Sequence, residues 1–164
     1  MPMGTYQQVI DQLKKSQIPY QIVDHPAAET TEQADEYIKG YEGVRTKSMF
    51  LKGKKKHFYL VILDDKKRFD FHEFQDLTGA KRVSMARPDD LKDQLGLVAG
   101  VVSPFGLMNN LDHNIQVYFD KDMLAEDPIL TFHPNENTHT IFLKSTDLMK
   151  FIHDQGFEPQ IIDL

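Results

Sequence analysis

The chain has 164 residues, of which 40% are hydrophobic and 27% charged, and this composition fits one compact globular domain over residues 1–164. It has no cysteine, which excludes thiol nucleophiles, thiolate zinc sites and disulfides, and no apolar run approaches the roughly 20 residues of a membrane helix. The net charge of −6 disfavours a nucleic-acid partner unless basic residues are clustered, because contacts to phosphate dominate such binding.

The first ten residues, MPMGTYQQVI, lack the basic flank and apolar stretch of a secretory signal, so we expect a cytoplasmic protein. Thr30 and Gln33 have the spacing of a capping box at the start of a helix. The elements predicted in the first half of the chain are a helix at 5–15, a strand at 20–23, a short acidic helix ending at Gly40, and strands at 46–52 and 57–63 that form a hairpin with a basic tip.

Turn residues divide the second half of the chain. Gly79 and Gly96 stand where a helix would stop, Pro88 suits a first helical turn, and Ser145 is a candidate N-cap. The predicted elements are a helix at 71–78, a strand at 81–86, a helix at 88–95, a loop through 96–106, strands at 115–119, 129–132 and 138–143, a helix at 145–155 and a strand at 158–162. Without a regular βαβ alternation, this order predicts an α+β fold with a mixed, largely antiparallel central sheet flanked by helices.

Basic residues gather in three short segments, whereas acidic residues concentrate at 29–42 and 120–127. Clustered lysine and arginine side chains are candidates for phosphate contacts, and a solvated charged turn is an equally good interpretation of the hairpin tip. The candidate RNA-binding residues are Lys52, Lys54, Lys55, Lys56, Arg68, Lys81 and Arg82.

Lys47 departs from the pattern of its strand. Strict alternation places it on the same face as Met49 and Leu51, so its ammonium would point toward an apolar side. Such a lysine costs stability unless it is partnered. The alternative is a lysine at a strand end whose ammonium reaches water.

Two turn segments also depart from their surroundings. In 100–106, glycines and a proline surround an apolar centre, and such a loop can aim several backbone N–H groups at one anion or carbonyl, although a simple tight turn is commoner. In 132–138, polar residues interrupt apolar ones, as they also do in an asparagine-stabilised hairpin connection. Phosphate loops, nucleophile elbows and HExxH helices are absent and the histidines are scattered, so no metal or cofactor is expected.

Together these segments resemble the YbaK/prolyl-tRNA editing-domain family, most closely its free-standing branch that deacylates alanyl-tRNA for proline. The resemblance covers nearly the whole chain and depends on the order and spacing of its motifs. The main ones are Asp24-His25-Pro26, Thr46-Lys47, Phe50-Leu51-Lys52, Gly79-Ala80-Lys81-Arg82, Gly100 to Leu107, and Phe132-His133-Pro134 with Asn137 and Thr138. The resemblance implies a curved mixed sheet with a substrate pocket on one side.

The resemblance also implies roles for single residues, the family's essential lysine falling on Lys47. The catalytic candidates are Lys47, Gly100, Val101, Val102 and Ser103. The substrate-binding candidates are Thr31, Ala34, Phe50, Pro104, Phe105, Gly106, His133, Asn137 and Thr138. Glu29 stands where relatives commonly carry an apolar residue and Ser48 where many carry asparagine, which leaves the amino-acid preference open.

The activity that this resemblance implies is removal of wrongly attached alanine from proline tRNA. An aminoacyl ester is already reactive, so the site needs only to position it, to stabilise the oxyanion and to supply water. The backbone amides of 100–103 are expected to stabilise the oxyanion, and a ribose hydroxyl of the substrate is expected to help activate the water. A pocket that admits an alanyl methyl can exclude the larger prolyl ring. The expected partners are the acceptor end of aminoacyl-tRNA for proline and prolyl-tRNA synthetase.

Two alternatives remain open. The first is a deacylase for another aminoacyl group on proline tRNA, such as cysteinyl. The second is a non-catalytic module that binds the tRNA acceptor end.

Overall fold

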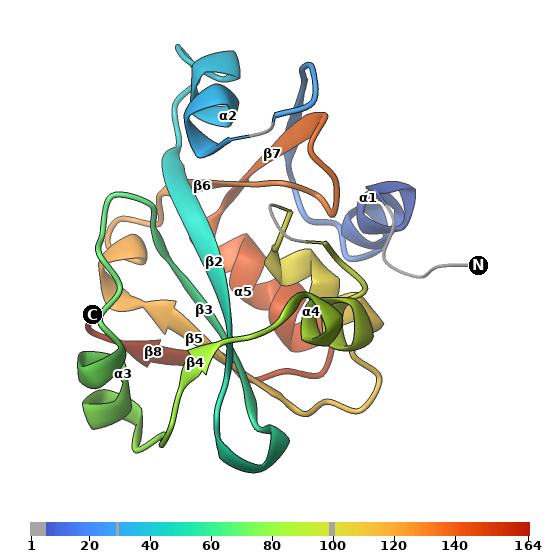
Figure 1. Cartoon of the computed structure of the whole chain (residues 1–164). Helices are drawn as coiled ribbons and strands as arrows, with labels where there is room; N and C mark the ends of the chain where they lie inside the picture. Colours follow the sequence, from blue (N-terminus) through green and yellow to red (C-terminus); the bar gives the residue numbers. More distant parts are fainter. Residues whose placement is uncertain (1–5, 29, 99–100) are drawn as a thin grey trace.

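The computed structural model describes residues 6–28, 30–98 and 101–164 (Figure 1). The α-helices of this part of the chain are α1 (Tyr6–Lys15), α2 (Thr31–Tyr37), α3 (Phe71–Thr78), α4 (Pro88–Leu95) and α5 (Ser145–Asp154). Short 3₁₀ segments are η1 (Lys54–Lys56), η2 (Pro104–Asn109) and η3 (Lys121–Met123). None of the helices described has the length and apolar character needed to cross a membrane.

The centre of the molecule is a mixed sheet of eight strands. They are β1 (Gln21–Asp24), β2 (Val44–Lys52), β3 (Phe58–Asp64), β4 (Ser84–Met85), β5 (Ile115–Asp120), β6 (Ile129–Phe132), β7 (His139–Lys144) and β8 (Gln160–Ile162). Their order is β1-β7-β6-β2-β3-β5-β8, and β4 pairs with β2 off this path. The β2–β6, β3–β5 and β5–β8 pairs are parallel and the other pairs are antiparallel, so the predicted mixed sheet flanked by helices is confirmed.

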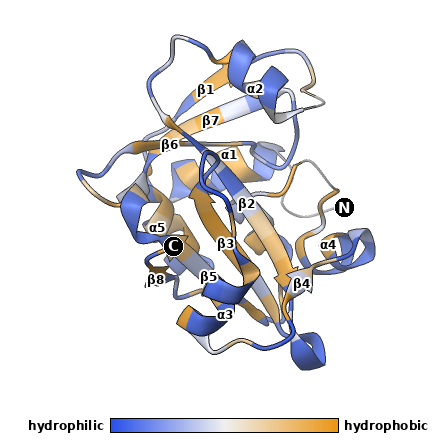
Figure 2. Ribbon diagram, turned by 60° about the vertical axis from the view of Figure 1, so that its left-hand side comes forward, coloured by the Kyte–Doolittle hydropathy of each residue, from blue (hydrophilic) through white to orange (hydrophobic). Residues whose placement is uncertain are grey.

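Hydrophobic side chains pack on both faces of this sheet. The larger cluster joins one face to residues of α1, α4, α5 and η2, and Phe50 belongs to it. The smaller cluster includes Leu51, Phe74 of α3 and, at its margin, Met49. Figure 2 shows the result in β2, whose first half, beside α2, is hydrophilic and whose second half is hydrophobic. The hydrophilic half of β2 is therefore available for a polar site.

Local signals placed most helix ends correctly. The Thr30 hydroxyl accepts a hydrogen bond from the Gln33 N–H at 3.1 Å, as the predicted cap requires. Gly79 and Gly96 end α3 and α4 in the left-handed conformation, with φ of 77° and 66°. This confirms both predicted stops, because glycine adopts positive φ without steric cost.

Two local predictions were wrong. The predicted strand at 81–86 is reduced to β4, because Arg82 has a φ of 55° and the Val83 N–H donates to the Gln75 side chain at 2.9 Å instead of to a strand. Ser145 is not an N-cap, since α5 begins at that residue. Its hydroxyl donates to Asp127, which also accepts from the Thr146 N–H at 3.0 Å and so caps α5 from outside the helix.

Candidate functional site

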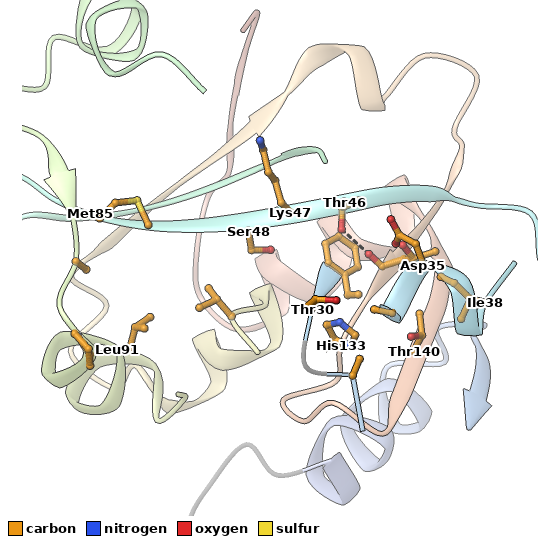
Figure 3. A pocket seen from close by; sticks show the side chains of 17 residues that line it. Thr30, Asp35, Ile38, Thr46, Lys47, Ser48, Met85, Leu91, His133 and Thr140 are labelled. Atoms are coloured by element: carbon orange, nitrogen blue, oxygen red, sulfur yellow. Dashed lines mark hydrogen bonds between the residues drawn. The ribbon is translucent and has the colours of Figure 1, made fainter. Parts of the chain in front are cut away.

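A cavity of about 500 Å³ opens beside the hydrophilic half of β2 (Figure 3). α2 and the segment before it form one wall, α4 with β4 forms another, and β6, β7 and Val102 complete it. Its lining residues are Ala28, Thr30, Ala34, Asp35, Ile38, Thr46, Lys47, Ser48, Met85, Ala86, Pro88, Leu91, Val102, Thr131, Phe132, His133 and Thr140. A cavity of this size and mixed polarity is typical of a small-molecule site.

The cavity lies at a gap in the pairing of β2. β6 pairs only with residues 44–45 and β4 only with residues 51–52, so the β2 edge between them has no strand partner in the described chain. The Phe50 carbonyl points to this edge, where it accepts from the Ala86 N–H at 3.0 Å. Because alternate peptide groups of a strand point to the same edge, the N–H and C=O of Ser48 face the cavity. The gap thus offers the cavity one main-chain donor and one acceptor.

Lys47 lines the cavity, but its ammonium is held outside. The side chain lies on the opposite face of β2 from Ser48, and its Nζ donates a hydrogen bond to the carbonyl of Lys67 in the segment between β3 and α3. Figure 3 shows the ammonium pointing away from Ser48 and His133. In this conformation the Lys47 ammonium lies on the face of β2 that is turned away from the cavity interior.

The 101–103 segment supplies part of the opposite wall, and the predicted catalytic residue Gly100 lies outside the described residues. Val102 lines the cavity. The Val101 N–H donates to the Val98 carbonyl at 3.3 Å, whereas the N–H groups of Val102 and Ser103 donate to no atom of the described chain. Of the two, only Val102 belongs to the cavity lining, so one of the predicted main-chain donors remains available for a ligand there.

Ser103 itself is fully buried and links two of the predicted segments. Its hydroxyl donates to the Asn135 side chain at 2.9 Å and accepts from the Phe105 N–H at 3.2 Å. The 101–103 segment and the 132–138 turn are thereby joined. Four of the predicted substrate-binding residues lie in the core and not in the cavity wall, namely Phe50, Pro104, Phe105 and Gly106.

His133 enters the cavity from the turn after β6. Its Nδ1 donates to the His139 carbonyl at 3.3 Å, because a carbonyl can only accept, so in the neutral ring Nε2 carries the lone pair. Burial lowers the pKa of His133 below its ordinary value, although the bond to His139 opposes the change. The ring is neutral at pH 7, and its Nε2 can accept a hydrogen bond.

Asn137 and Thr138 support the wall from behind. The Asn137 amide donates to the Ala28 carbonyl at 3.1 Å, and the Thr138 carbonyl accepts from the His25 N–H at 2.9 Å. Neither residue lines the cavity, but both fix the segment that carries Ala28. Of the predicted α2 positions, Ala34 lines the cavity; Thr31 begins the helix, and its side chain is not among those described.

A model of the aminoacyl-tRNA editing domain family matches residues 25–151, a span that includes every cavity residue named above. The chain belongs to this family. The predicted family resemblance and the predicted class of enzyme, a hydrolase of aminoacyl-tRNA, are confirmed.

Individual relatives of this editing domain agree with that assignment. The prolyl-tRNA editing protein ProX of Acetoanaerobium sticklandii is 32% identical over 165 residues, which cover 100% of both chains. Prolyl-tRNA synthetase associated domain-containing protein 1 of Danio rerio is 24% identical over 162 residues, 98% of this chain and 88% of the relative. A proposed trans-editing enzyme for prolyl-tRNA synthetase, known from its crystal structure, has a TM-score of 0.76 and 20% identity over 100% of this chain and 98% of that one. The solved structure shows the shared fold.

Several cavity residues of the editing domain were not predicted. They include Thr30, Asp35, Thr46, Leu91, Thr131 and Thr140. A signal for Asp35 was present, because positions 31, 34, 35 and 38 recur at the spacing of one helical face. The threonines gave no such signal, since their convergence depends on strands that are distant in the sequence.

Asp35 contacts a second carboxyl group, Asp65, which lies outside the cavity lining. Burial, the charge of Asp35 and a side-chain hydrogen bond to Asp35 raise the pKa of Asp65 from 3.8 to about 6. Between these two pH values, the Asp65 carboxyl keeps its proton in the folded protein and loses it in the unfolded chain. The contribution of Asp65 to the free energy of unfolding is therefore fully present below pH 4 and is lost as the pH rises through 6.

Asp65→Asn is expected to stabilise the editing domain at pH 8 by about 1–2 kcal/mol. Complete linkage over two pKa units would give roughly 3 kcal/mol, and solvent screening of the partly exposed pair reduces it. Urea unfolding at pH 8 and pH 4.5 measures the effect, which should shrink at the lower pH. Asp93→Asn, on the exposed face of α4, is the matched control. A stabilisation by Asp65→Asn that is equal at the two pH values would contradict this account.

Most of the predicted RNA-binding residues lie around the tip of the β2–β3 hairpin, whereas Arg68 follows β3 at the other end of that hairpin. Lys54 and Lys81 line a second hollow of about 320 Å³, and Lys52 lies 3.8 Å from the Asp90 carboxylate. The other candidates, Lys55, Lys56, Arg68 and Arg82, are exposed. The structure brings Lys54 and Lys81 together, whereas Lys52 is partly neutralised by Asp90.

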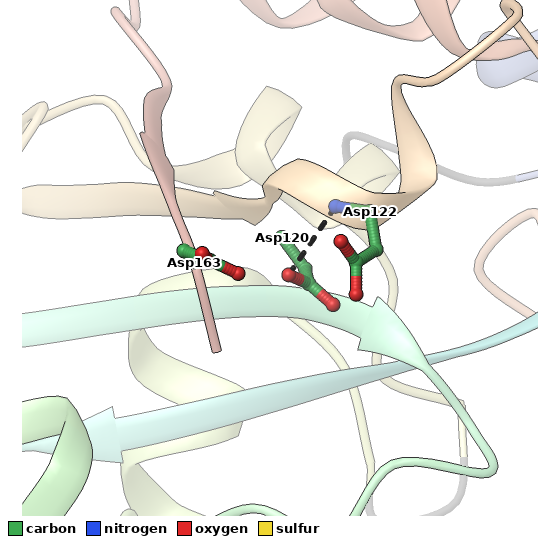
Figure 4. A group of neighbouring side chains, drawn as sticks. All are labelled: Asp120, Asp122 and Asp163. Carbon is green, nitrogen blue, oxygen red and sulfur yellow. Dashed lines mark hydrogen bonds between the residues drawn. The ribbon is translucent and has the colours of Figure 1, made fainter.

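Three carboxylates meet at the C-terminal end of β5 (Figure 4). They belong to Asp120, Asp122 and Asp163, and their oxygens lie within 4.8 Å of one another. The Lys67 ammonium occupies the position that a cation would take among these carboxylates. Its Nζ lies 2.7 Å from Asp120 Oδ2 and 2.6 Å from Asp122 Oδ2, and it donates to the Leu164 carbonyl at 2.9 Å. Asp120 Oδ2 meets no strict hydrogen-bond geometry, but its 2.7 Å ion pair with Lys67 compensates the buried charge. The cluster is a structural ion pair.

Proposed function

We propose that the chain is a trans-editing hydrolase that deacylates mischarged alanyl-tRNA for proline. The observation that carries the proposal is the convergence of Lys47, Val102 and His133, from three separate segments, on one cavity. The names of the relatives support the same substrate class, since one is a prolyl-tRNA editing protein and another is associated with prolyl-tRNA synthetase. The cavity is large enough for an aminoacyl group together with part of the terminal adenosine.

The reaction needs little beyond positioning and charge stabilisation, because the ester is reactive. The N–H group of Val102 would stabilise the developing oxyanion, a well-aimed donor contributing on the order of 3 kcal/mol. The neutral Nε2 of His133 would accept a hydrogen bond from the terminal ribose or from the attacking water. Lys47, whose ammonium lies outside the cavity, would hold a phosphate of the acceptor end. A ribose hydroxyl of the substrate would help to activate the water.

Selection among amino acids would be steric. Ala34 of α2 and Ile38, the residue after that helix, form a tightly packed wall, 5% and 2% exposed, that limits the length of the bound side chain. An alanyl methyl fits beside such a wall more readily than a prolyl ring, whereas a synthetase site built for proline rejects alanine by only roughly 1–3 kcal/mol per missing methylene. A separate hydrolase that accepts small side chains compensates for this limit.

The test is a panel of alanyl-, cysteinyl- and prolyl-tRNA for proline, each incubated with the protein and assayed for loss of the acyl group. We expect rapid hydrolysis of the alanyl species and a rate for the prolyl species close to that without protein. Hydrolysis of the cysteinyl but not the alanyl species would contradict the alanine assignment. Binding of all three without hydrolysis of any would indicate a non-catalytic acceptor-end module.

A further inference from the structure

We propose that Asp35 binds the α-ammonium group of the substrate's amino acid, so that the cavity recognises the free amino group as well as the small side chain. This inference rests on the proposed function, because it names a contact to the same aminoacyl ester. The cavity would then select its substrate by the positive charge of the amino group as well as by the size of the side chain.

Asp35 is the one carboxylate among the described residues that line the cavity. It projects from α2 at the end of the cavity that also carries Thr46 and Thr140 (Figure 3). An ammonium group has three N–H donors, and it is best bound by a carboxylate with further oxygen acceptors beside it. The carboxylate and the threonine hydroxyls together provide such acceptors.

The charge of Asp35 is not neutralised by an ion pair within the described chain. The nearby Arg45 guanidinium is occupied by the carbonyls of Ile38, Tyr41 and Gly43 at 2.9–3.0 Å. The Lys47 ammonium is bound to the Lys67 carbonyl, on the other face of β2. The cavity end is therefore an anionic position without a resident cation.

A second carboxyl group strengthens this preference. Asp65 forms a side-chain hydrogen bond with Asp35 and repels it when both are ionised. An exposed lysine, Lys66, only partly offsets the repulsion. A cation that enters the cavity relieves the repulsion between the two carboxylates, whereas a neutral group of the same size does not. The pair thus favours a positively charged ligand over its neutral isostere.

The lactyl ester is the neutral isostere of the alanyl ester, since a hydroxyl replaces the ammonium group and the methyl is unchanged. We expect wild-type protein to have a higher kcat/KM for alanyl-tRNA than for lactyl-tRNA of the same tRNA. Asp35→Asn should lower the value for the alanyl ester by about 10- to 100-fold and leave the lactyl ester nearly unchanged, because a charge-assisted hydrogen bond contributes about 1.5–3 kcal/mol. Asp154→Asn, an exposed carboxylate on α5, is the control and should change neither rate.

Binding separates this inference from the proposed function. Calorimetry with amide-linked alanyl-adenosine and its lactyl counterpart should show a preference for the alanyl compound in wild type that is lost in Asp35→Asn. Wild-type hydrolysis of alanyl-tRNA together with an unchanged alanyl-to-lactyl ratio in Asp35→Asn would overturn the inference alone. Absence of wild-type hydrolysis with a binding preference that depends on Asp35 would overturn the proposed reaction and retain the ammonium contact. A midpoint of thermal unfolding in Asp35→Asn that is not below that of wild type checks the fold.

Discussion

Lys47→Ala is expected to lower kcat/KM for deacylation of alanyl-tRNA on the order of 100-fold. The variant removes the cation of a cavity-lining residue, and a charge-assisted hydrogen bond to a phosphate contributes about 3 kcal/mol at most. Stability should change by less than about 1 kcal/mol, since the folded protein loses one hydrogen bond to a main-chain carbonyl. Single-turnover deacylation and thermal unfolding, measured on the same preparation, separate the two effects.

Lys92→Ala is the matched control for this variant, because it removes an exposed lysine of α4 that does not line the cavity. Its rate should equal that of wild type. An unchanged rate in Lys47→Ala would exclude the proposed phosphate contact, and an equal loss in both variants would indicate a general effect of positive charge.

Lys67→Met is expected to destabilise the protein by about 3–5 kcal/mol, the largest effect on stability that we predict. The Asp120 side chain is fully buried, and removing its partner leaves an uncompensated charge in the interior. Although burial opposes it, the side-chain contacts and negative charges of Asp120 and Asp122 raise the pKa of the Lys67 ammonium, so Lys67 is charged at neutral pH. Urea unfolding at pH 7 measures the loss.

Two further variants test this interpretation. Lys66→Met removes the exposed neighbour and should change stability by less than about 0.5 kcal/mol. Adding Asp120→Asn to Lys67→Met removes the buried charge and should recover a substantial part of the loss, which a double-mutant cycle quantifies. A loss of similar size in Lys66→Met, or no recovery in the double variant, would show that the ion pair is not the cause.

The features that could be predicted from the sequence depend on local signals. The start of α2 follows from the Thr30 side chain, and the ends of α3 and α4 follow from two glycines with positive φ. Alternation along β2 placed Met49 and Leu51 on one face, where both contact the cluster against α3. Such signals involve neighbours within one turn or one strand, so a single sequence contains them.

The features that could not be predicted depend on contacts between distant segments. The cavity exists because β6 and β4 leave one edge of β2 unpaired between them. No residue of β2 carries a sequence signal for that gap. Lys47 was predicted from its place in the strand, but the direction of its ammonium is determined by the Lys67 carbonyl. Asp65, which forms a side-chain hydrogen bond with Asp35, is 30 positions away in the chain and follows another strand.

Binding of amide-linked alanyl-adenosine, followed by NMR, tests most directly whether the cavity beside β2 is where the aminoacyl end binds. The account predicts the largest amide shifts at Ala34, Ser48, Val102 and His133, and smaller shifts throughout when the prolyl compound is used instead. Shifts confined to the second hollow, around Gly79 and Gln116, would contradict the account, as would equal shifts with the two compounds.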